Sequence, residues 1–144
     1  MNQSMNEALS LASNEYSRLI SSESQVINKA QSCLIVIAGQ SIWLLSNLQF
    51  NHWLPCATFI SFLLTVLFDF WAIKNIKRSE IALDDYSVLA QMSKENFGLI
   101  LLREYESLIE EMRGILSIRK VCFNLTFLGI CLTFLGLLLS ATIL

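Results

Sequence analysis

The sequence predicts an all-α membrane protein with three transmembrane helices, and three observations lead to this fold class. Hydrophobic residues make up 54% of the 144 positions, charged residues 15%, and the mean hydropathy is +0.55, which lies outside the range of soluble domains. Long stretches contain no charge, and the basic residues fall in only two regions. We therefore predict a cytoplasmic amphipathic helix (1–29), a transmembrane hairpin (30–73), a cytoplasmic helical hairpin that extends the second and third spans (74–120) and a third transmembrane helix (121–144).

The amino-terminal segment, Met5–Ile27, is predicted to be an amphipathic helix with a break near Ser21–Ser24. The alternative is a frayed polar tail. Lys and Arg are sparse here, which favours packing against other helices over binding at the membrane surface. Glu23 interrupts a heptad-like pattern of apolar positions, which are Leu9, Ala12, Tyr16, Leu19 and Val26.

The transmembrane hairpin is predicted from Ala30–Phe68, which contains no Asp, Glu, Lys or Arg and is divided by a turn-like segment at Asn47–Pro55. The first span, about Gln31–Leu48, is the least apolar and carries Gln40 near mid-membrane. A buried amide needs a partner, and an interhelical hydrogen bond there is worth about 0.6 to 2 kcal/mol. Gln40 is thus a structural contact or, alternatively, a pore-lining residue.

The second span, about Leu54–Ile73, places Ala57, Ser61, Thr65 and Asp69 at four-residue steps on one face. Asp69 is the ionisable residue that we place inside the hydrocarbon region, where charges are costly and by default suggest function. It either pairs with Lys29, Lys74 or Arg119 at the inner interface or lines a water-filled path. The candidate pore face consists of Gln40, Ser61, Thr65 and Asp69.

The central segment, Lys74–Lys120, reads as two helices with a reversal at Ser93–Gly98, where Ser, Asn and Gly cluster. The alternative is one long helix lying along the membrane. Its acidic residues alternate with Arg and suit a solvated face. Apolar positions recur through the segment, at Tyr86, Leu89, Met92, Phe97, Leu101, Leu108, Met112 and Ile115.

The last segment, Val121–Leu144, has 24 uncharged residues, which at about 1.5 Å each can cross a hydrocarbon core of roughly 30 Å. Small residues recur along it at alternating steps of four and three. In lipid, small residues allow helices to approach closely, and this period suits a left-handed crossing. We therefore predict a seam through which copies of the chain form a homo-oligomer, made of Cys122, Thr126, Gly129, Thr133, Gly136 and Ser140.

The positions of Lys and Arg set the expected orientation. All ten lie in 1–29 or 74–120, and basic residues close to the ends of spans mark the cytoplasmic side. We expect the amino terminus inside and the carboxyl terminus at the outer face. The start of the chain lacks a basic stretch followed by an apolar core, so the first span is expected to act as the insertion signal.

Several classes of function are disfavoured. The sequence has no HExxH, CxxC, phosphate-binding glycine loop or GxSxG motif, so we expect neither an enzyme nor a cofactor or metal site. The pI near 5.3 and the lack of a basic patch argue against nucleic-acid binding. His52, the single histidine, is expected at the surface. The cysteines are expected to be small buried hydrophobes without disulfides, and they are Cys33, Cys56, Cys122 and Cys131.

The order of amphipathic helix, transmembrane hairpin and long charged helix, with KRSEIALDDYSVL (Lys77–Leu89) after the hairpin, resembles the SLATT-type two-transmembrane effector domains. The likeness is one of layout over about residues 5–120, and the third span departs from the two-span pattern. Those domains are small bacterial membrane proteins thought to form pores in conflict and anti-phage systems. The resemblance implies a bacterial inner-membrane location and a pore-forming role in anti-phage defence.

Two functions follow from these features. In the first, the protein self-associates in the lipid bilayer and acts as a pore-forming or membrane-perturbing effector that its cytoplasmic helices gate. In the second, it is an assembly or sensor subunit that docks a soluble cytoplasmic protein partner, as amphipathic helices do in grooves. The contact would then be Phe97, Leu101, Leu108 and Met112.

Overall fold

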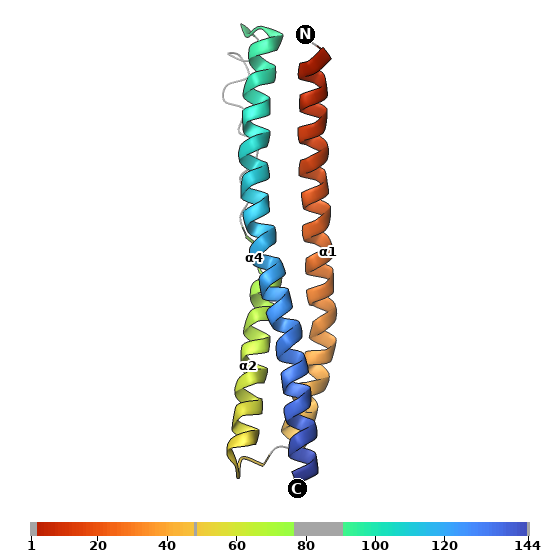
Figure 1. The fold of residues 1–144 in the computed structure, drawn as a ribbon, viewed down its shortest axis with the longest axis vertical. Helices are drawn as coiled ribbons and strands as arrows, with labels where there is room; N and C mark the ends of the chain where they lie inside the picture. The colour runs from red at the N-terminus through yellow and green to blue at the C-terminus, as the bar shows by residue number, and fades with distance from the viewer. Residues whose placement is uncertain (1–2, 48, 77–90, 144) are drawn as a thin grey trace. The chain divides into compact units, whose positions relative to one another are not determined.

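The chain is all-helical over the part that its computed structural model describes, which is residues 3–47, 49–76 and 91–143. Three helices occupy these ranges: α1 (Gln3–Asn47), α2 (Trp53–Ile73) and α4 (Lys94–Ile143) (Figure 1). The all-α prediction is confirmed for this part of the chain. The descending half of the predicted cytoplasmic hairpin lies mostly in 77–90, outside the described residues.

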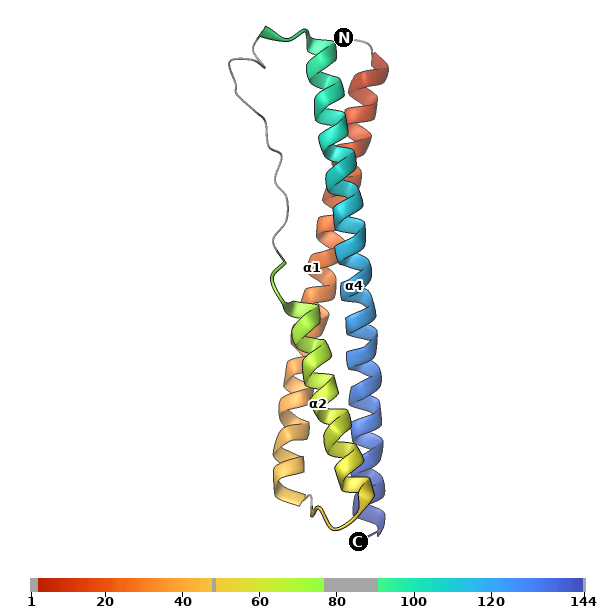
Figure 2. The same ribbon diagram turned by 90° about the vertical axis from the view of Figure 1, so that its left-hand side faces the viewer.

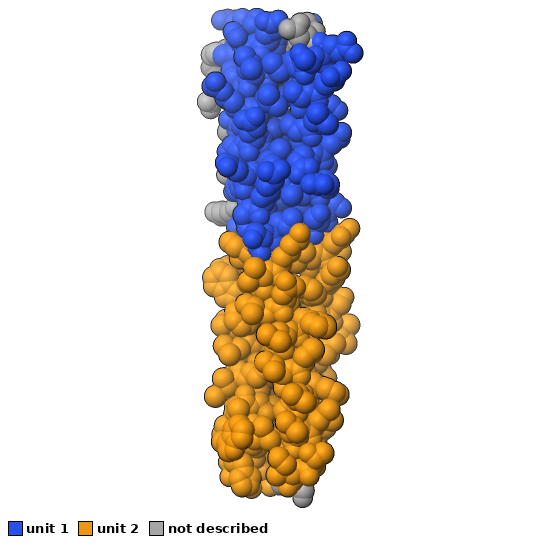
Figure 3. Space-filling view, in the orientation of Figure 1, with its two compact units in different colours: residues 1–23, 75–117 blue, residues 24–74, 118–144 orange. Residues whose placement is uncertain are grey.

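The helices divide into two compact units, coloured separately in Figure 3. Unit 1 comprises Met1–Glu23 and Asn75–Ser117, and unit 2 comprises Ser24–Lys74 and Ile118–Leu144. Helices α1 and α4 each contribute residues to both units, whereas α2 belongs to unit 2.

Helix α1 continues through Ser21–Ser24, so the predicted break there is wrong. Serine interrupts a helix only weakly, and a single buried face runs along the helix on both sides of this segment. The buried positions recur at steps of three, four or seven, as one face of an α-helix requires. They are Leu19, Glu23, Val26, Ala30, Ile37, Gln40 and Leu44.

In unit 1, α1 and α4 lie side by side and run in the same direction. Three contacts set this register: Gly98 lies against Met5, the rings of Tyr16 and Tyr105 meet edge to face at 6.2 Å, and a salt bridge joins Glu15 to Arg113 at 3.3 Å. The apolar core of the pair includes residues of α4 from Leu108 to Leu116.

Helix α4 begins directly after Ser93. The Ser93 hydroxyl accepts a hydrogen bond from the Asn96 N–H at 3.3 Å, and the Ser93 carbonyl accepts one from the Phe97 N–H at 3.1 Å. Glu95 in the first turn suits the positive end of the helix dipole. The helix then continues without interruption from Lys94 to Ile143.

In unit 2, α2 runs antiparallel to α4 (Figure 2). Helix α1 also contacts α4 there, through Gln40 and Trp43. Pro55 is accommodated in the first turn of α2, where a missing N–H costs nothing. Helices α2 and α4 are both long and apolar enough to cross a membrane, and 22% of each apolar window is buried within the chain. Most of each window therefore faces outward, unlike the core helix of a soluble protein.

Candidate functional site

The packed face of unit 2 lies between α2 and α4 and is built from small residues. A Cβ added to Gly129 would overlap the Thr65 hydroxyl oxygen and lie 3.1 Å from Thr65 Cβ. A Cβ added to Gly136 would likewise overlap the Thr58 hydroxyl oxygen and lie 3.0 Å from Thr58 Cγ2. The two glycines therefore let α2 approach α4 more closely than any side chain would allow.

The predicted seam is the part of α4 that forms this face. Thr126, Thr133 and Gly136 are buried, and the other three members are half-buried. Within the chain, α2 packs against this seam (Figure 2). Contact of the seam with a second copy of the chain stays a prediction.

Buried hydroxyls along this face are satisfied mostly within their own helices. Thr58 donates to the Leu54 carbonyl at 2.9 Å, and Thr65 to the Ser61 carbonyl at 2.8 Å. On α4, Thr126 donates to a carbonyl one turn earlier at 2.9 Å. Because these three bonds do not cross the interface, the three hydroxyls contribute to the contact of α2 with α4 by close packing and not by hydrogen bonding.

Gln40 connects α1 to α4. Its Nε2 donates to the Ile130 carbonyl at 2.9 Å, and the side chain is buried. Its Oε1 is also buried and has no hydrogen-bond partner among the described residues. The amide thus has an interhelical partner for its donor and an unused acceptor in the interior.

Asp69 is the most unusual residue of unit 2. It is fully buried, at 0% exposure, and neither carboxyl oxygen has a hydrogen-bond partner in the described part of the chain. Of the four predicted pore-face residues, Gln40, Thr65 and Asp69 are buried in unit 2, whereas Ser61 is half-buried and accepts from Thr133 at 3.3 Å. The face therefore points into the unit.

Arg119 is a residue whose role the sequence reasoning missed. We assigned it to the inner flank of the third span, but its side chain is 1% exposed. Its guanidinium donates to the Ala72 carbonyl at 2.6 Å and to the Lys74 carbonyl at 2.8 Å, at the carboxyl end of α2. These carbonyls lack helical partners, and a cation suits the negative end of the dipole. The sequence signal was its position directly before the uncharged segment.

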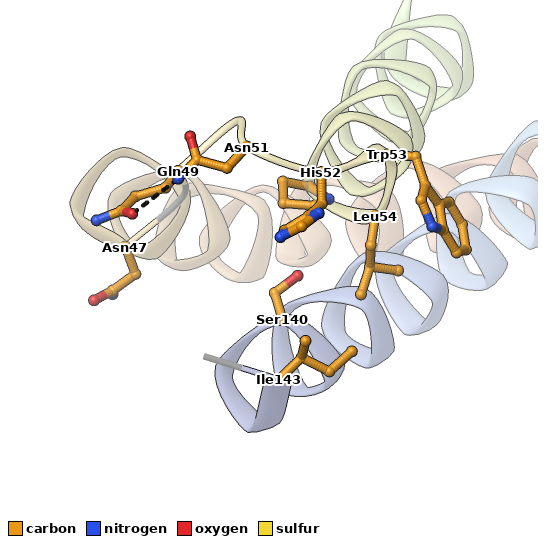
Figure 4. A pocket seen from close by; sticks show the side chains of 9 residues that line it. Asn47, Gln49, Asn51, His52, Trp53, Leu54, Ser140 and Ile143 are labelled. Atoms are coloured by element: carbon orange, nitrogen blue, oxygen red, sulfur yellow. Dashed lines mark hydrogen bonds between the residues drawn. The ribbon is translucent and has the colours of Figure 1, made fainter.

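A pocket of about 220 Å³ lies where the loop before α2 meets the end of α4. In Figure 4 the Ser140 hydroxyl points toward the His52 ring, and Leu54 and Ile143 form the apolar side. His52 is exposed, as expected, and its side chain does not cap α2. The Ser140 oxygen is buried without a hydrogen-bond partner among the described residues.

Two of the cysteines correct our expectation. Cys56 and Cys131 are exposed on the surface of unit 2, whereas Cys33 and Cys122 are half-buried, and all four are free thiols. The small-hydrophobe interpretation places cysteines inside the protein, but an apolar side chain can equally face outward on a lipid-facing helix. Among the residues that the structure describes, no three His, Cys, Asp or Glu side chains gather as a metal site.

The predicted partner face belongs to unit 1. Leu108 and Met112 are buried, at 4% and 2% exposure, whereas Phe97 and Leu101 are half-buried. The face that we expected to bind a soluble protein therefore packs largely within the unit itself.

No family model, curated protein or solved structure matches this chain.

Proposed function

We propose that the protein spans the membrane three times and acts as a pore-forming or membrane-perturbing effector. The spans are the second part of α1, α2 and the second part of α4. The observation that carries the proposal is that unit 2 buries polar side chains and exposes apolar ones. The buried polar set is Gln40, Thr58, Thr65, Asp69, Arg119, Thr126 and Thr133.

The outward surface of unit 2 suits a hydrocarbon environment. Large apolar side chains are exposed on all three helices, including Ile35 at 78%, Phe70 at 60% and Phe127 at 59%. In water such a surface would promote aggregation, whereas in lipid it costs nothing. The polar interior then becomes the part of the protein that water or ions would occupy.

Opening between α2 and α4 breaks the Thr133–Ser61 hydrogen bond and, if it extends to the end of α2, the bonds from Arg119 to the Ala72 and Lys74 carbonyls. The hydroxyls of Thr58, Thr65 and Thr126 keep their partners when the helices separate, because those partners lie in the same helix. A small tilt of α2 would expose these hydroxyls and Asp69 to water. Helices α1 and α4 run unbroken from unit 1 into unit 2, which supports gating by the cytoplasmic helices.

The proposal includes an orientation and an assembly state. The distribution of basic residues favours an amino terminus in the cytoplasm and a carboxyl terminus at the outer face, and the resemblance in layout to the SLATT-type domains favours a bacterial inner membrane. We also propose self-association. Because α2 covers the α4 seam in this structure, copies would meet through the outward faces or after α2 has moved.

Dye and potassium release from vesicles tests the pore proposal. The reconstituted full-length chain is compared with Gln40→Leu and Asp69→Asn, which remove polar groups from the interior. Ser46→Ala is the matched control, because Ser46 is exposed and donates only to the Ile42 carbonyl. We expect release by the wild type and the control, and a strong loss in the two interior variants. Absence of release from the wild type, or full release in both interior variants, would refute the pore role.

The docking-subunit function is the second candidate. The half-buried positions Phe97 and Leu101 favour it weakly, because part of their surface is open to a partner. Leu108 and Met112 would have to leave the core of unit 1 to take part. Surface substitution at Leu99, which is 49% exposed, should reduce recovery of a soluble partner if docking is the function, and should leave vesicle release unchanged.

A further inference from the structure

Among the described residues of unit 2, Asp69 has two buried side-chain oxygens without a hydrogen-bond partner, whereas Gln40 and Ser140 have one each. The neighbouring Thr65 hydroxyl and the buried Arg119 guanidinium both donate to backbone carbonyls. Asp69 is as deeply buried as they are, yet both of its oxygens are without hydrogen-bond partners among the described residues.

The chemistry of a carboxyl group limits which form fits this place. An ionised carboxylate taken out of water needs a cation or several hydrogen-bond donors, and without them it is costly. A neutral carboxylic acid has no net charge to solvate. The packed arrangement around Asp69 therefore suits a carboxyl that has bound a proton.

We propose that Asp69 is a reversible proton-binding site that couples the packing of α2 against α4 to pH. In the packed form the carboxyl holds its proton. When the helices separate and water enters, the O–H bond breaks, the proton passes to water and a hydrated carboxylate remains. This inference deepens the proposed function, since it rests on the same spans opening, but proton binding itself can be measured without any release assay.

Other titratable groups on the three helices bear on this site. On α1, the Cys33 thiol lies within electrostatic range of the Asp69 carboxyl, and Glu23 is buried further back on the same face. On α4, Arg119 is buried and its guanidinium donates to the Ala72 and Lys74 carbonyls. On α2, the Lys74 ammonium is exposed and lies 4.8 Å from the Trp71 ring. The test must therefore isolate Asp69 from these groups.

The small number of aspartates in the sequence allows the protonation of Asp69 to be observed separately from that of the other groups. It contains three aspartates, Asp69, Asp84 and Asp85, and the latter two lie outside the described residues. A full-length chain with Asp84→Asn and Asp85→Asn keeps Asp69 as its sole aspartate. Labelling that chain with [¹³C]aspartate makes the infrared absorption of protonated aspartate report on Asp69 alone.

The infrared measurement is made on this chain in lipid nanodiscs from pH 5 to 9. We expect an isotope-shifted band of a protonated carboxyl at neutral pH, and its loss when Asp69→Asn is added. A chain that shows only ionised ¹³C-carboxylate at neutral pH would overturn the proposal, and this readout does not depend on the folding of any Asp69 variant.

The coupling is tested by thermal unfolding over the same pH range. If the packed form binds one proton more than the unfolded form, the equilibrium constant for packing falls by up to about tenfold for each unit of rising pH. The Asp69→Asn substitution should remove this pH dependence. The same pH slope in both chains would overturn the coupling. A wild-type stability that follows sodium or potassium concentration, and not pH, would overturn it in favour of a cation site. Loss of vesicle release with the band intact would refute the pore proposal alone.

Discussion

Substitution of Gly129 by alanine tests the packing of α2 on α4 most directly. The added methyl group would overlap the Thr65 hydroxyl oxygen and would lie 3.4 Å from the Thr65 Cα. The backbone of α2 cannot rotate away from this contact as a side chain could. We therefore expect α2 to move outward along the seam or to lose part of its packing.

The magnitude follows from two opposing effects. Forcing a methyl group into a well-packed contact costs about 1–3 kcal/mol. Replacing glycine by alanine within a helix contributes about 0.8–1.0 kcal/mol of stability in the other direction. Gly39 in α1 has no atom within 4 Å of its added Cβ, so Gly39→Ala shows the second effect without the first. The difference between the two variants should therefore be about 1–3 kcal/mol.

The assay is reversible unfolding of the protein in lipid or mild detergent, followed by helical circular dichroism. Gly129→Ala should unfold at a lower temperature than the wild type, and Gly39→Ala at the same or a higher one. Adding Thr65→Ala to Gly129→Ala removes the overlapping hydroxyl, and the double-mutant cycle should show a favourable coupling of at least about 0.5 kcal/mol.

Equal unfolding of the Gly129→Ala and Gly39→Ala variants would refute the reasoning. If Gly129→Ala instead changed the number of subunits in the particle while each chain kept its stability, the seam would join copies of the chain as the sequence first suggested. A seam within one chain therefore predicts a change in unfolding temperature, whereas a seam between chains predicts a change in the number of subunits.

Two further predictions concern charged residues. Arg119→Met removes the donors to the Ala72 and Lys74 carbonyls, and hydrogen bonds from a charged group are worth about 1.5–3 kcal/mol each. We expect faster amide hydrogen exchange in the last turn of α2, and Arg119→Lys should restore only part of the protection. In unit 1, hydrogen bonding from Arg113 holds the pKa of Glu15 below its ordinary value of 4.5. A carboxyl whose pKa is lowered in the folded form stabilises that form at pH values above its ordinary pKa. This contribution is lost as the pH falls through the lowered pKa of the folded form. The melting temperature of Glu15→Gln should accordingly depend less on pH below about 4.5 than that of the wild type, and identical profiles would contradict the pairing.

The helices were predictable where the sequence pattern is local. The uncharged run and the turn-like residues before it locate the second span at Leu54–Ile73, and α2 occupies Trp53–Ile73. The cluster of Ser, Asn and Gly at Ser93–Gly98 lies where α4 begins, whereas the half of the predicted hairpin before it lies mostly outside the described residues. The break at Ser21–Ser24 was wrong because serines lower helix propensity only slightly, whereas the buried face of α1 continues past them.

The identity of packing partners was not predictable from the same patterns. Small residues on α4 indicate how closely a helix may approach, but not whether that helix is α2 or another chain. The amide of Gln40 required a partner, yet a backbone carbonyl such as that of Ile130 carries no sequence signal. From the sequence, Arg119 was interpreted as a basic residue that marks the cytoplasmic end of a span. Its burial depends on the position of the carboxyl end of α2, whose carbonyls accept its hydrogen bonds, and the sequence pattern does not give that position.

The local hydrogen bonds of the seam hydroxyls also bear on biogenesis. Thr58, Thr65 and Thr126 satisfy their donors within single helices, so in the proposed membrane-spanning form these hydroxyls need no neighbouring helix on entry into lipid, whereas Gln40 and Arg119 find their partners on another helix. Assembly of the bundle then exchanges lipid contacts for helix contacts and leaves these hydrogen bonds unchanged.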